Sequence, residues 1–392
     1  MKDRIIFHVD VNNAFLSWSA VYLLNHDYKK DIRKIPSVIG GDEKKRTGIV
    51  LAKSPIAKRY NIITGETLYS ARKKCPNIEI FSPLFSWYYK ESNLMYSYLK
   101  NYTPNIERFS VDECFLDMTG TNLLYKDYLS LAYKIKDDIK EQFGFTVNVG
   151  IGNNKLCAKM ASDFEKPDKV HTLFKDEITN KMWPLPIEEL FMVGKKMSIK
   201  LKALNINSIG DLANTPLNTL KINFKNQANF LKNSALGIDN SCVITNNERL
   251  SISTSQTLPY DYEDKEKILK ILQEQTDQVA RQLRNSKKYC KNIAVTYKNN
   301  NFVNYTHQKS LYNAINESNE IYEIVKEIFS KSYRNDPLRL IGVRLGDFVT
   351  DRNCQISLFE EVKEKNKFQE TLDKLQNKFG EKSIFKASKY KK

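Results

Sequence analysis

Acidic residues stand in two strand-like segments that are far apart in the sequence. Asp10 directly follows the apolar stretch Ile5–Val9, and Asp112 and Glu113 lie in the segment Glu107–Asp117. Hard divalent cations such as Mg²⁺ bind carboxylate oxygens, water and substrate phosphates, and two such ions about 3.5–4 Å apart suit phosphoryl transfer. Three carboxylates on neighbouring strands repel one another without a cation. If these strands are neighbours, the acids therefore predict a bound pair of metal ions, although either segment alone is typical of a strand end or a solvated turn.

Lysines suited to phosphate contacts follow another strand-like run, Phe145–Ile151. Lys155 and Lys159 are four positions apart and share one face of a helix, and Lys166 precedes a proline in the triplet Glu-Lys-Pro. An ammonium group is a compact charge that suits a diffuse anion such as a triphosphate. A solvated helix face is the alternative interpretation of Lys155 and Lys159.

The composition of the chain indicates a large protein with a polyanionic partner. Its 392 residues predict roughly two to four domains, and 41% hydrophobic residues exclude disorder over the whole length. The net charge of +16 favours nucleic acid or an anionic membrane surface. No apolar run approaches the ~18 residues of a membrane span, and the N-terminus lacks the pattern of a secretory signal. The six scattered cysteines form no metal or disulfide pattern, so we expect a reducing cytoplasm.

The hydrophobic patterns divide the chain into segments of different character. Residues 1–175 alternate strands with helices, which predicts a sheet layered by helices, and residues 176–240 contain short amphipathic helices. The polar stretch 241–252 is a plausible linker. Residues 253–349 have a β-α-β-β-α-β order, and the tail 350–392 has one helical stretch and a basic end.

Four stretches, in this order and spacing, resemble those of the Y-family (translesion) DNA polymerases of the bacterial DNA polymerase IV and UmuC type. They are His8–Asn12, Ser110–Glu113, Val149–Lys155 with Ala158 and Lys159, and Glu165–Pro167. The resemblance covers about residues 1–350. It implies an α+β multidomain fold shaped like a right hand, with a ferredoxin-like palm, small fingers, a helical thumb and a β-α-β-β-α-β little finger. The implied boundaries are 1–12 and 80–175 for the palm, 13–79 for the fingers, 176–240 for the thumb, 241–252 for the linker, 253–349 for the little finger and 350–392 for the tail.

The resemblance also implies the roles of individual residues at the reaction centre. Asp10, Asp112 and Glu113 would be the catalytic residues and, with the Val11 carbonyl, would bind two Mg²⁺ ions. Phe15 would be the steric gate that excludes a 2′-hydroxyl, and plain core packing is its alternative.

Three lysines would complete the nucleotide site by binding the triphosphate. They are Lys58, Lys166 and Lys159, and the alternative role of Lys159 is to fix the palm. Two positions depart from the family pattern. Pro55 replaces a tyrosine that contacts phosphate, so this contact is missing or comes from Ser54 or Lys53. Ala14 replaces a residue that is often aromatic, which could loosen the floor of the nucleotide pocket.

Two further segments resemble elements that bind DNA or a partner protein. The turn before Ile199 resembles a helix-hairpin-helix, in which Gly194, Lys195 and Lys196 would contact a DNA phosphate. Met192 takes the place of the first glycine of that hairpin, and an ordinary helical turn is the alternative. In the tail, Gln355, Leu358 and Phe359 match the Q-x-x-L-F peptide that binds the bacterial sliding clamp.

The function that this resemblance implies is template-directed, low-fidelity translesion DNA synthesis. The enzyme would be a monomeric, cytoplasmic DNA-directed DNA polymerase that uses primer–template DNA and deoxynucleoside triphosphates and does not bind membranes. A non-catalytic, clamp-associated DNA-binding protein on the same scaffold is one alternative, which the intact acids disfavour. A nucleotidyl cyclase is another, but it would have no use for the hairpin, the second DNA-gripping domain or the clamp peptide.

Overall fold

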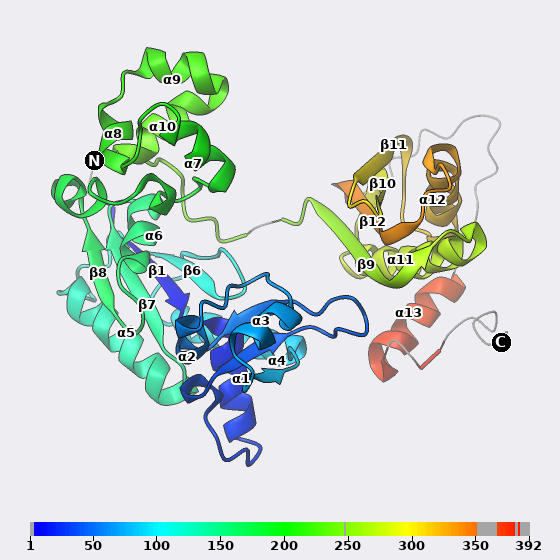
Figure 1. The fold of residues 1–392 in the computed structure, drawn as a ribbon, viewed down its shortest axis with the longest axis horizontal. Helices are drawn as coiled ribbons and strands as arrows, with labels where there is room; N and C mark the ends of the chain where they lie inside the picture. The colour runs from blue at the N-terminus through cyan, green and yellow to red at the C-terminus, as the bar shows by residue number, and fades with distance from the viewer. Residues whose placement is uncertain (1–3, 247, 351–366, 381–382, 385–392) are drawn as a thin grey trace. The chain divides into compact units, whose positions relative to one another are not determined.

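The computed structural model describes residues 4–246, 248–350, 367–380 and 383–384. The chain forms two compact units, of which the first comprises Met1–Glu43 with Gly48–Asn247 and the second Lys44–Thr47 with Glu248–Lys392 (Figure 1). Helices and strands alternate in both units, and the strands form three separate sheets in the described ranges, as expected for the predicted α+β multidomain fold. No helix in the described ranges is both long and apolar enough to cross a bilayer.

A five-stranded sheet with the order β5-β6-β1-β7-β8 forms the centre of the first unit (Figure 1). Its strands are β1 (Ile6–Val11), β5 (Ile106–Arg108), β6 (Glu113–Asp117), β7 (Val147–Gly152) and β8 (Val170–Leu173). The central strand β1 is antiparallel to both β6 and β7, whereas β7 and β8 are parallel. Every residue of β1 and β7 is buried, so both faces of the sheet are covered.

The side chains of β1 alternate between the two faces of the sheet, and the two faces have different packing partners. Phe7, Val9 and Val11 pack into the main hydrophobic core with residues of α1 (Ala14–Leu24), α4 (Phe85–Leu99) and α5 (Tyr128–Phe143). On the other face, Ile6 packs against Ala158 of α6 (Lys155–Asp163). His8 and Asp10 share that second face, so the polar residues of β1 point toward α6.

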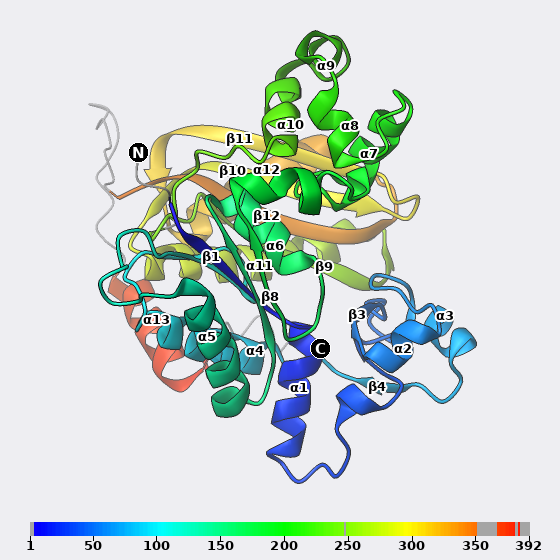
Figure 2. The ribbon, with the colours of Figure 1, turned by 90° about the vertical axis from the view of Figure 1, so that its left-hand side faces the viewer.

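A second, three-stranded sheet makes up the part predicted as fingers. It consists of β3 (Val50–Lys53), β2 (Ser37–Gly40) and β4 (Glu79–Phe81), in that order, with the helices α2 (Pro55–Arg59) and α3 (Leu68–Lys74) and the 3₁₀ turn η1 (Ile32–Lys34) beside it. Figure 2 shows this small sheet and its two helices as a separate layer, which the chain reaches from β1 through α1.

The all-helical segment predicted as the thumb follows β8. Its helices are α7 (Lys195–Lys202), α8 (Ile209–Asn214), α9 (Leu217–Phe224) and α10 (Ala228–Ala235), with shorter turns η2 (Lys175–Glu177), η3 (Ile178–Met182), η4 (Ile187–Glu189) and η5 (Lys225–Gln227). Its hydrophobic core includes Leu156 and Met160 of α6. Helix α6 therefore packs against the central sheet and against the helical core.

The second unit has the predicted β-α-β-β-α-β order. Its elements are β9 (Ser251–Tyr262), α11 (Lys265–Asn285), β10 (Tyr289–Asn299), β11 (Asn304–Ile315), α12 (Ser318–Ser332) and β12 (Leu338–Val349), and the antiparallel sheet has the order β11-β10-β12-β9. Apolar residues of both helices pack on the sheet. The predicted helical stretch of the tail is α13 (Lys367–Phe379), held to α11 by a nearly buried ion pair between Arg284 and Asp373 at 2.6 Å.

Candidate active site

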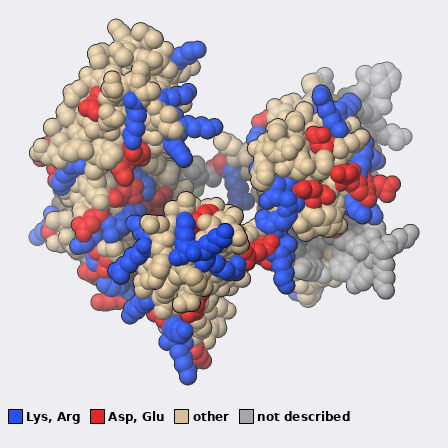
Figure 3. Space-filling model, viewed as in Figure 1, with Lys and Arg blue, Asp and Glu red and all other residues tan. Residues whose placement is uncertain are grey.

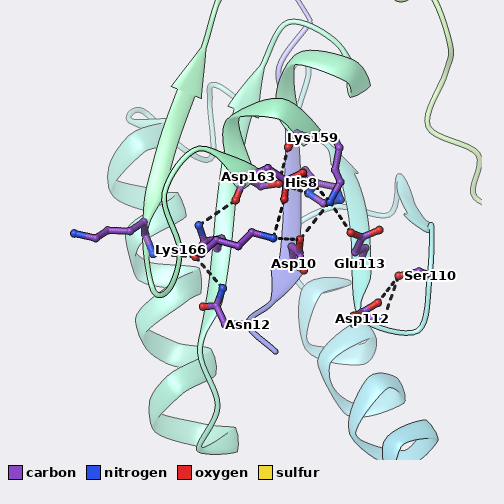
Figure 4. Close-up of polar contacts among 12 residues, drawn as sticks. His8, Asp10, Asn12, Ser110, Asp112, Glu113, Lys159, Asp163 and Lys166 are labelled. Carbon is purple, nitrogen blue, oxygen red and sulfur yellow. Dashed lines mark hydrogen bonds and ion pairs between the residues drawn. The ribbon is translucent and has the colours of Figure 1, made fainter. Parts of the chain in front are cut away.

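The pairing of β1 with β6 brings the predicted acidic residues to one end of the central sheet. Asp10 lies directly opposite Glu113, and the Val11 N–H donates to the backbone carbonyl of Asp112 (3.1 Å). Asp10 is nearly buried, and the other two acids are partly exposed. The Asp112 carboxylate accepts a hydrogen bond from Ser110 Oγ (2.6 Å; Figure 4).

Two lysines contact Asp10, and one of them also contacts Glu113 (Figure 4). Lys159 Nζ is 2.6 Å from Glu113 Oε1 and 3.3 Å from Asp10 Oδ2. Lys166 Nζ is 2.6 Å from the same Asp10 oxygen. Asp163 joins both ammonium groups, at 3.2 Å from Lys159 and 2.7 Å from Lys166. The arrangement is a continuous cluster of acids and lysines in which Asp10 and Asp163 are bridging residues.

Burial and charge shift the pKa values of this cluster in opposite directions. Burial raises the pKa of Glu113, and this effect exceeds the lowering by Lys159. Burial alone would lower the pKa of Lys159, but the nearby carboxylates, Asp10 foremost, raise it above its ordinary value. The pKa of Lys166 is raised in the same way. Both lysines are therefore charged at neutral pH and offset the repulsion among the acids.

The donor set fits a hard divalent cation, although the side chains do not enclose one as they stand. Carboxylate oxygens are the ligands that Mg²⁺ prefers, and like-charge repulsion from Asp10 and Asp112 contributes to the raised pKa of Glu113. Within the described ranges, no group of three His, Cys, Asp or Glu side chains is positioned to hold an ion. Lys159 and Lys166 both contact Oδ2 of Asp10, while the Asp112 carboxylate faces Ser110.

Two glycines of β7 allow helix α6 to lie close enough to place Lys159 in the cluster. A Cβ atom at Gly150 would lie 2.0 Å from the Ala158 carbonyl oxygen and 2.4 Å from the Ser162 nitrogen, both of which are backbone atoms. At Gly152 the corresponding atom would lie 2.7 Å from the Ala158 nitrogen. Any side chain at either position would push α6 away from the sheet.

A buried histidine of β1 contacts the same sheet-facing side of α6. His8 Nδ1 and Ser162 Oγ are 2.8 Å apart, and the serine hydroxyl donates to the Lys159 carbonyl oxygen (2.8 Å). Because the hydroxyl proton is used in that bond, His8 Nδ1 must be the donor to the serine oxygen. Burial, followed by the charge of Lys159, lowers the pKa of His8, so the ring is neutral.

Phe15 lies on α1 and stacks on Tyr88. The ring centroids are 4.8 Å apart at an interplanar angle of 12°, and the Tyr88 hydroxyl bonds to Ser19 Oγ (2.7 Å). Phe15 is only partly buried, so one face of the ring has support while the side chain keeps an accessible surface. Ala14 is buried in the main hydrophobic core, which places its small side chain in packing contacts.

The departure at Pro55 has a local structural explanation. Pro55 is the first residue of α2, where a proline is favoured because no helical N–H bond is lost. Ser54 caps this helix by accepting from the Ala57 N–H (3.0 Å), and its hydroxyl is fully buried. Ser54 is therefore unsuited to replace the missing phosphate contact. Lys58 is exposed in the last turn of α2 and takes no part in the contacts that join the carboxylate cluster.

The predicted hairpin of the thumb keeps a backbone conformation that favours glycine. Met192 has φ = 70° and is mostly exposed, so it occupies the left-handed region where the family pattern has glycine. Gly194 precedes the first turn of α7, and Lys195 and Lys196 are exposed at the start of that helix. Figure 3 shows Lys and Arg side chains projecting from the part of the surface that α7–α10 form. The clamp residues Gln355, Leu358 and Phe359 lie outside the described residues.

Sequence reasoning missed three residues of the site. Asp163 bridges the two lysines, Ser162 links His8 to α6, and Asn148 lies opposite Asp10 on β7. The position of Asp163, four residues after Lys159, was a usable signal, because residues four apart on a helix meet. Its contact with Lys166 had no such signal, because α6 ends at Asp163 and Lys166 lies beyond it.

Known proteins are similar to this chain over most of its length. Models of the impB/mucB/samB family match residues 9–163 and, for its C-terminal domain, residues 249–358. A protein named DNA polymerase IV from Clostridium acetobutylicum is 48% identical over 98% of this chain and 98% of its own length. DNA polymerase IV 2 from Bacillus subtilis is 32% identical over 99% of this chain and 95% of its own. The solved structure of a chimeric Y-family DNA polymerase has the same fold, with a TM-score of 0.77, 24% identity and coverage of 88% of this chain and all of that one. The chain therefore belongs to the impB/mucB/samB family of Y-family DNA polymerases.

Proposed function

We propose that this protein, a DNA-directed DNA polymerase of the translesion class by its family, adds deoxynucleotides to a primer end at the Asp10–Asp112–Glu113 cluster. The observation that carries the proposal is the strand register that sets Asp10 opposite Glu113, next to Lys159 and Lys166. Acids in this arrangement hold divalent cations, and the lysines provide positive charge for phosphates.

The family uses divalent metal ions, and we assign two Mg²⁺ ions to Asp10, Asp112, Glu113 and the Val11 carbonyl. When bound, the ions supply the positive charge that favours ionisation of the primer 3′-hydroxyl and stabilises the leaving pyrophosphate. With the ions bound, Asp10 would hold them in place of its ammonium partners, and Lys166 would be free to contact the triphosphate. Lys159 would stay beside Glu113 and favour its ionised form against the effect of burial.

The remaining residues of the site orient the nucleotide and exclude the wrong one. Phe15, supported on Tyr88, blocks the space that a ribonucleotide 2′-hydroxyl would need. Lys58 contacts the triphosphate from the fingers. Gly194 at the start of α7 faces a phosphate of the DNA duplex, together with the two lysines that follow it.

Partners and location form a separate part of the proposal. The substrates are primer–template DNA and deoxynucleoside triphosphates, the protein is a cytoplasmic monomer, and Gln355–Phe359 binds the sliding clamp. Deleting these five residues is expected to spare extension by the free polymerase and abolish its stimulation by the clamp. Full stimulation of the deletion variant would reject the assignment of the peptide.

Primer extension tests the assignment of the catalytic residues. Asp112→Ala should abolish extension of a primed template with Mg²⁺ while leaving DNA binding intact. Asp117→Ala is the matched control, because Asp117 lies at the far end of β6 and its carboxylate bonds to the Thr119 N–H (2.9 Å). Unchanged extension by Asp112→Ala would refute the site. Binding without extension by the unaltered protein would favour the non-catalytic alternative.

A further inference from the structure

We infer that Asn12 and Asn148 act together as positioning residues that hold the loop carrying Lys166, and through it set the position of that lysine at the triphosphate site. The inference rests on the proposed function of Lys166. It concerns a pair of amide side chains that have no contact with the carboxylates and that the mechanism above does not use.

The two amides are buried between the sheet and the loop that follows α6. Asn148 is fully buried on β7, and Asn12 is 6% exposed at the end of β1. Asn12 Nδ2 donates to Asn148 Oδ1 (3.0 Å). Because an unpaired buried amide is costly, each of these side chains needs hydrogen-bond partners.

Both amides bind the backbone of the loop that carries Lys166, residues 165–169. Asn12 Oδ1 accepts from the Asp168 N–H (2.9 Å), and Asn148 Oδ1 accepts from the Lys169 N–H (3.3 Å). Asn148 Nδ2 donates to the Glu165 carbonyl oxygen (2.6 Å). The contacts therefore fall on both sides of Lys166, which fixes where its Cα atom lies.

The same amide also ties the loop to helix α6. Asn148 Nδ2 makes its second donation to the Ser162 carbonyl oxygen (3.0 Å). With two donations and two accepted bonds, Asn148 uses its whole hydrogen-bonding capacity. It joins β1, β7, the end of α6 and the loop at a single point.

The backbone groups leave one arrangement of the pair. A backbone N–H can only donate, so the N–H groups of Asp168 and Lys169 must face the side-chain oxygens of Asn12 and Asn148, respectively. A backbone carbonyl can only accept, so the Glu165 carbonyl must face the side-chain nitrogen of Asn148. Asn12 Nδ2 must then face Asn148 Oδ1. An aspartate at position 12 would place a carboxylate oxygen against Asn148 Oδ1, and the two oxygens would repel each other. If the Asn148 amide turned over to relieve this repulsion, its oxygen would instead face the carbonyl oxygens of Ser162 and Glu165. The pair therefore works only as two amides.

The consequence for the reaction concerns the placement of one charge. From this loop Lys166 Nζ reaches within 2.6 Å of Asp10 and 2.7 Å of Asp163, so the position of the loop sets which oxygens the ammonium group can reach, including those of a bound triphosphate. Charge-assisted hydrogen bonds depend steeply on distance. Loosening the loop should therefore weaken nucleotide binding with little effect on DNA binding.

A double-mutant cycle on steady-state kinetics tests the inference. Asn148→Leu has nearly the same shape as the natural residue but no polar atoms. It should raise KM for the incoming deoxynucleotide about tenfold or more, with a smaller effect on kcat. In a Lys166→Ala background the same change should have no further effect on KM, because the two residues act through one contact.

Two further variants keep the test decisive. If Asn148→Leu does not fold, Asn12→Ser removes only the Asn12 contacts and enters the same cycle. Asn299→Leu is the control, because Asn299 is a buried amide of the second unit that accepts from the Val303 N–H (2.9 Å). It should lower thermal stability without a selective rise in KM.

The outcomes separate this inference from the role of Lys166 itself. An unchanged KM in Asn148→Leu, or an equal rise with and without Lys166, would overturn the positioning role while leaving Lys166 in place. If Lys166→Ala alone does not raise KM, the assignment of Lys166 to the triphosphate is wrong, and the positioning role is overturned with it. A rise that depends on Lys166 supports both.

Discussion

Replacing Lys159 with methionine should destabilise the protein in EDTA and do so less in Mg²⁺. Lys159 is 9% exposed at its side chain and contacts both Glu113 and Asp10. Methionine keeps the length of the side chain but removes the charge. Glu113 then has no ion-pair partner in the described ranges, whereas Asp10 keeps Lys166.

The size of the effect follows from these distances. At an effective dielectric constant of about 20, charges 2.6 Å and 3.3 Å apart attract by roughly 5–6 kcal/mol each, and the desolvation of the ions offsets much of this. Removing one partner of a buried pair costs about 3–5 kcal/mol. Because Asp10 keeps a second lysine, we expect the free energy of unfolding to fall by an amount near the lower end of this range, about 3 kcal/mol. For a unit of this size that corresponds to a fall in Tm of roughly 6–12 °C.

Thermal unfolding with and without Mg²⁺ is the assay. Lys159→Met removes a competitor for the carboxylate oxygens, so the variant should bind Mg²⁺ more tightly than the unaltered protein. If its Kd is about tenfold lower, saturating Mg²⁺ stabilises the variant by about 1.4 kcal/mol more than the unaltered protein, and the loss should shrink by that difference. Lys155→Met is the matched control, because Lys155 lies one turn earlier on α6 and pairs with the buried Glu107 at 2.7 Å. If Mg²⁺ rescues both variants equally, or neither, the ion does not bind where the lysine sits.

Three other predictions test separate parts of the structure. Phe15→Ala should admit ribonucleotides at least about tenfold more readily, because it removes a supported ring from the sugar site; equal discrimination in single-nucleotide incorporation would remove Phe15 from the gate. Asp168, whose pKa is lowered by two lysines of α5 although burial opposes them, should stabilise the fold by about 1 kcal/mol relative to Asp168→Asn. This difference should be complete above the ordinary carboxyl pKa of about 4 and vanish as the pH falls through the depressed value, so a pH-independent difference in unfolding free energy would contradict it. Gly150→Ala should cost at least about 3 kcal/mol in unfolding and most of the activity, because its Cβ meets backbone atoms of α6; near-native stability and extension would show that the helix can move away without loss.

The sequence alone predicted the carboxylates of the site better than their surroundings. The acids stand at strand positions, and the period of two places Asp10 on a defined face, so the convergence with Glu113 followed from one antiparallel pairing. The role of Asn148 depends on a loop that the chain reaches only after α6, and no local pattern marks such a contact. The structural reason for the proline at position 55 could not be predicted either, because it depends on the residue at which α2 begins.

The alternation along β1 also explains why the site can be both rigid and charged. Phe7, Val9 and Val11 belong to the main core, so the strand cannot shift without disrupting it. The opposite face carries His8 and Asp10 and is covered by a helix that two glycines allow to approach at backbone contact. Water is thereby excluded from one side of the carboxylates, which strengthens every charge interaction there. If side chains larger than glycine stood between the sheet and α6, Lys159 would lie farther from the acids. Its ammonium group could then no longer offset the repulsion between the carboxylates.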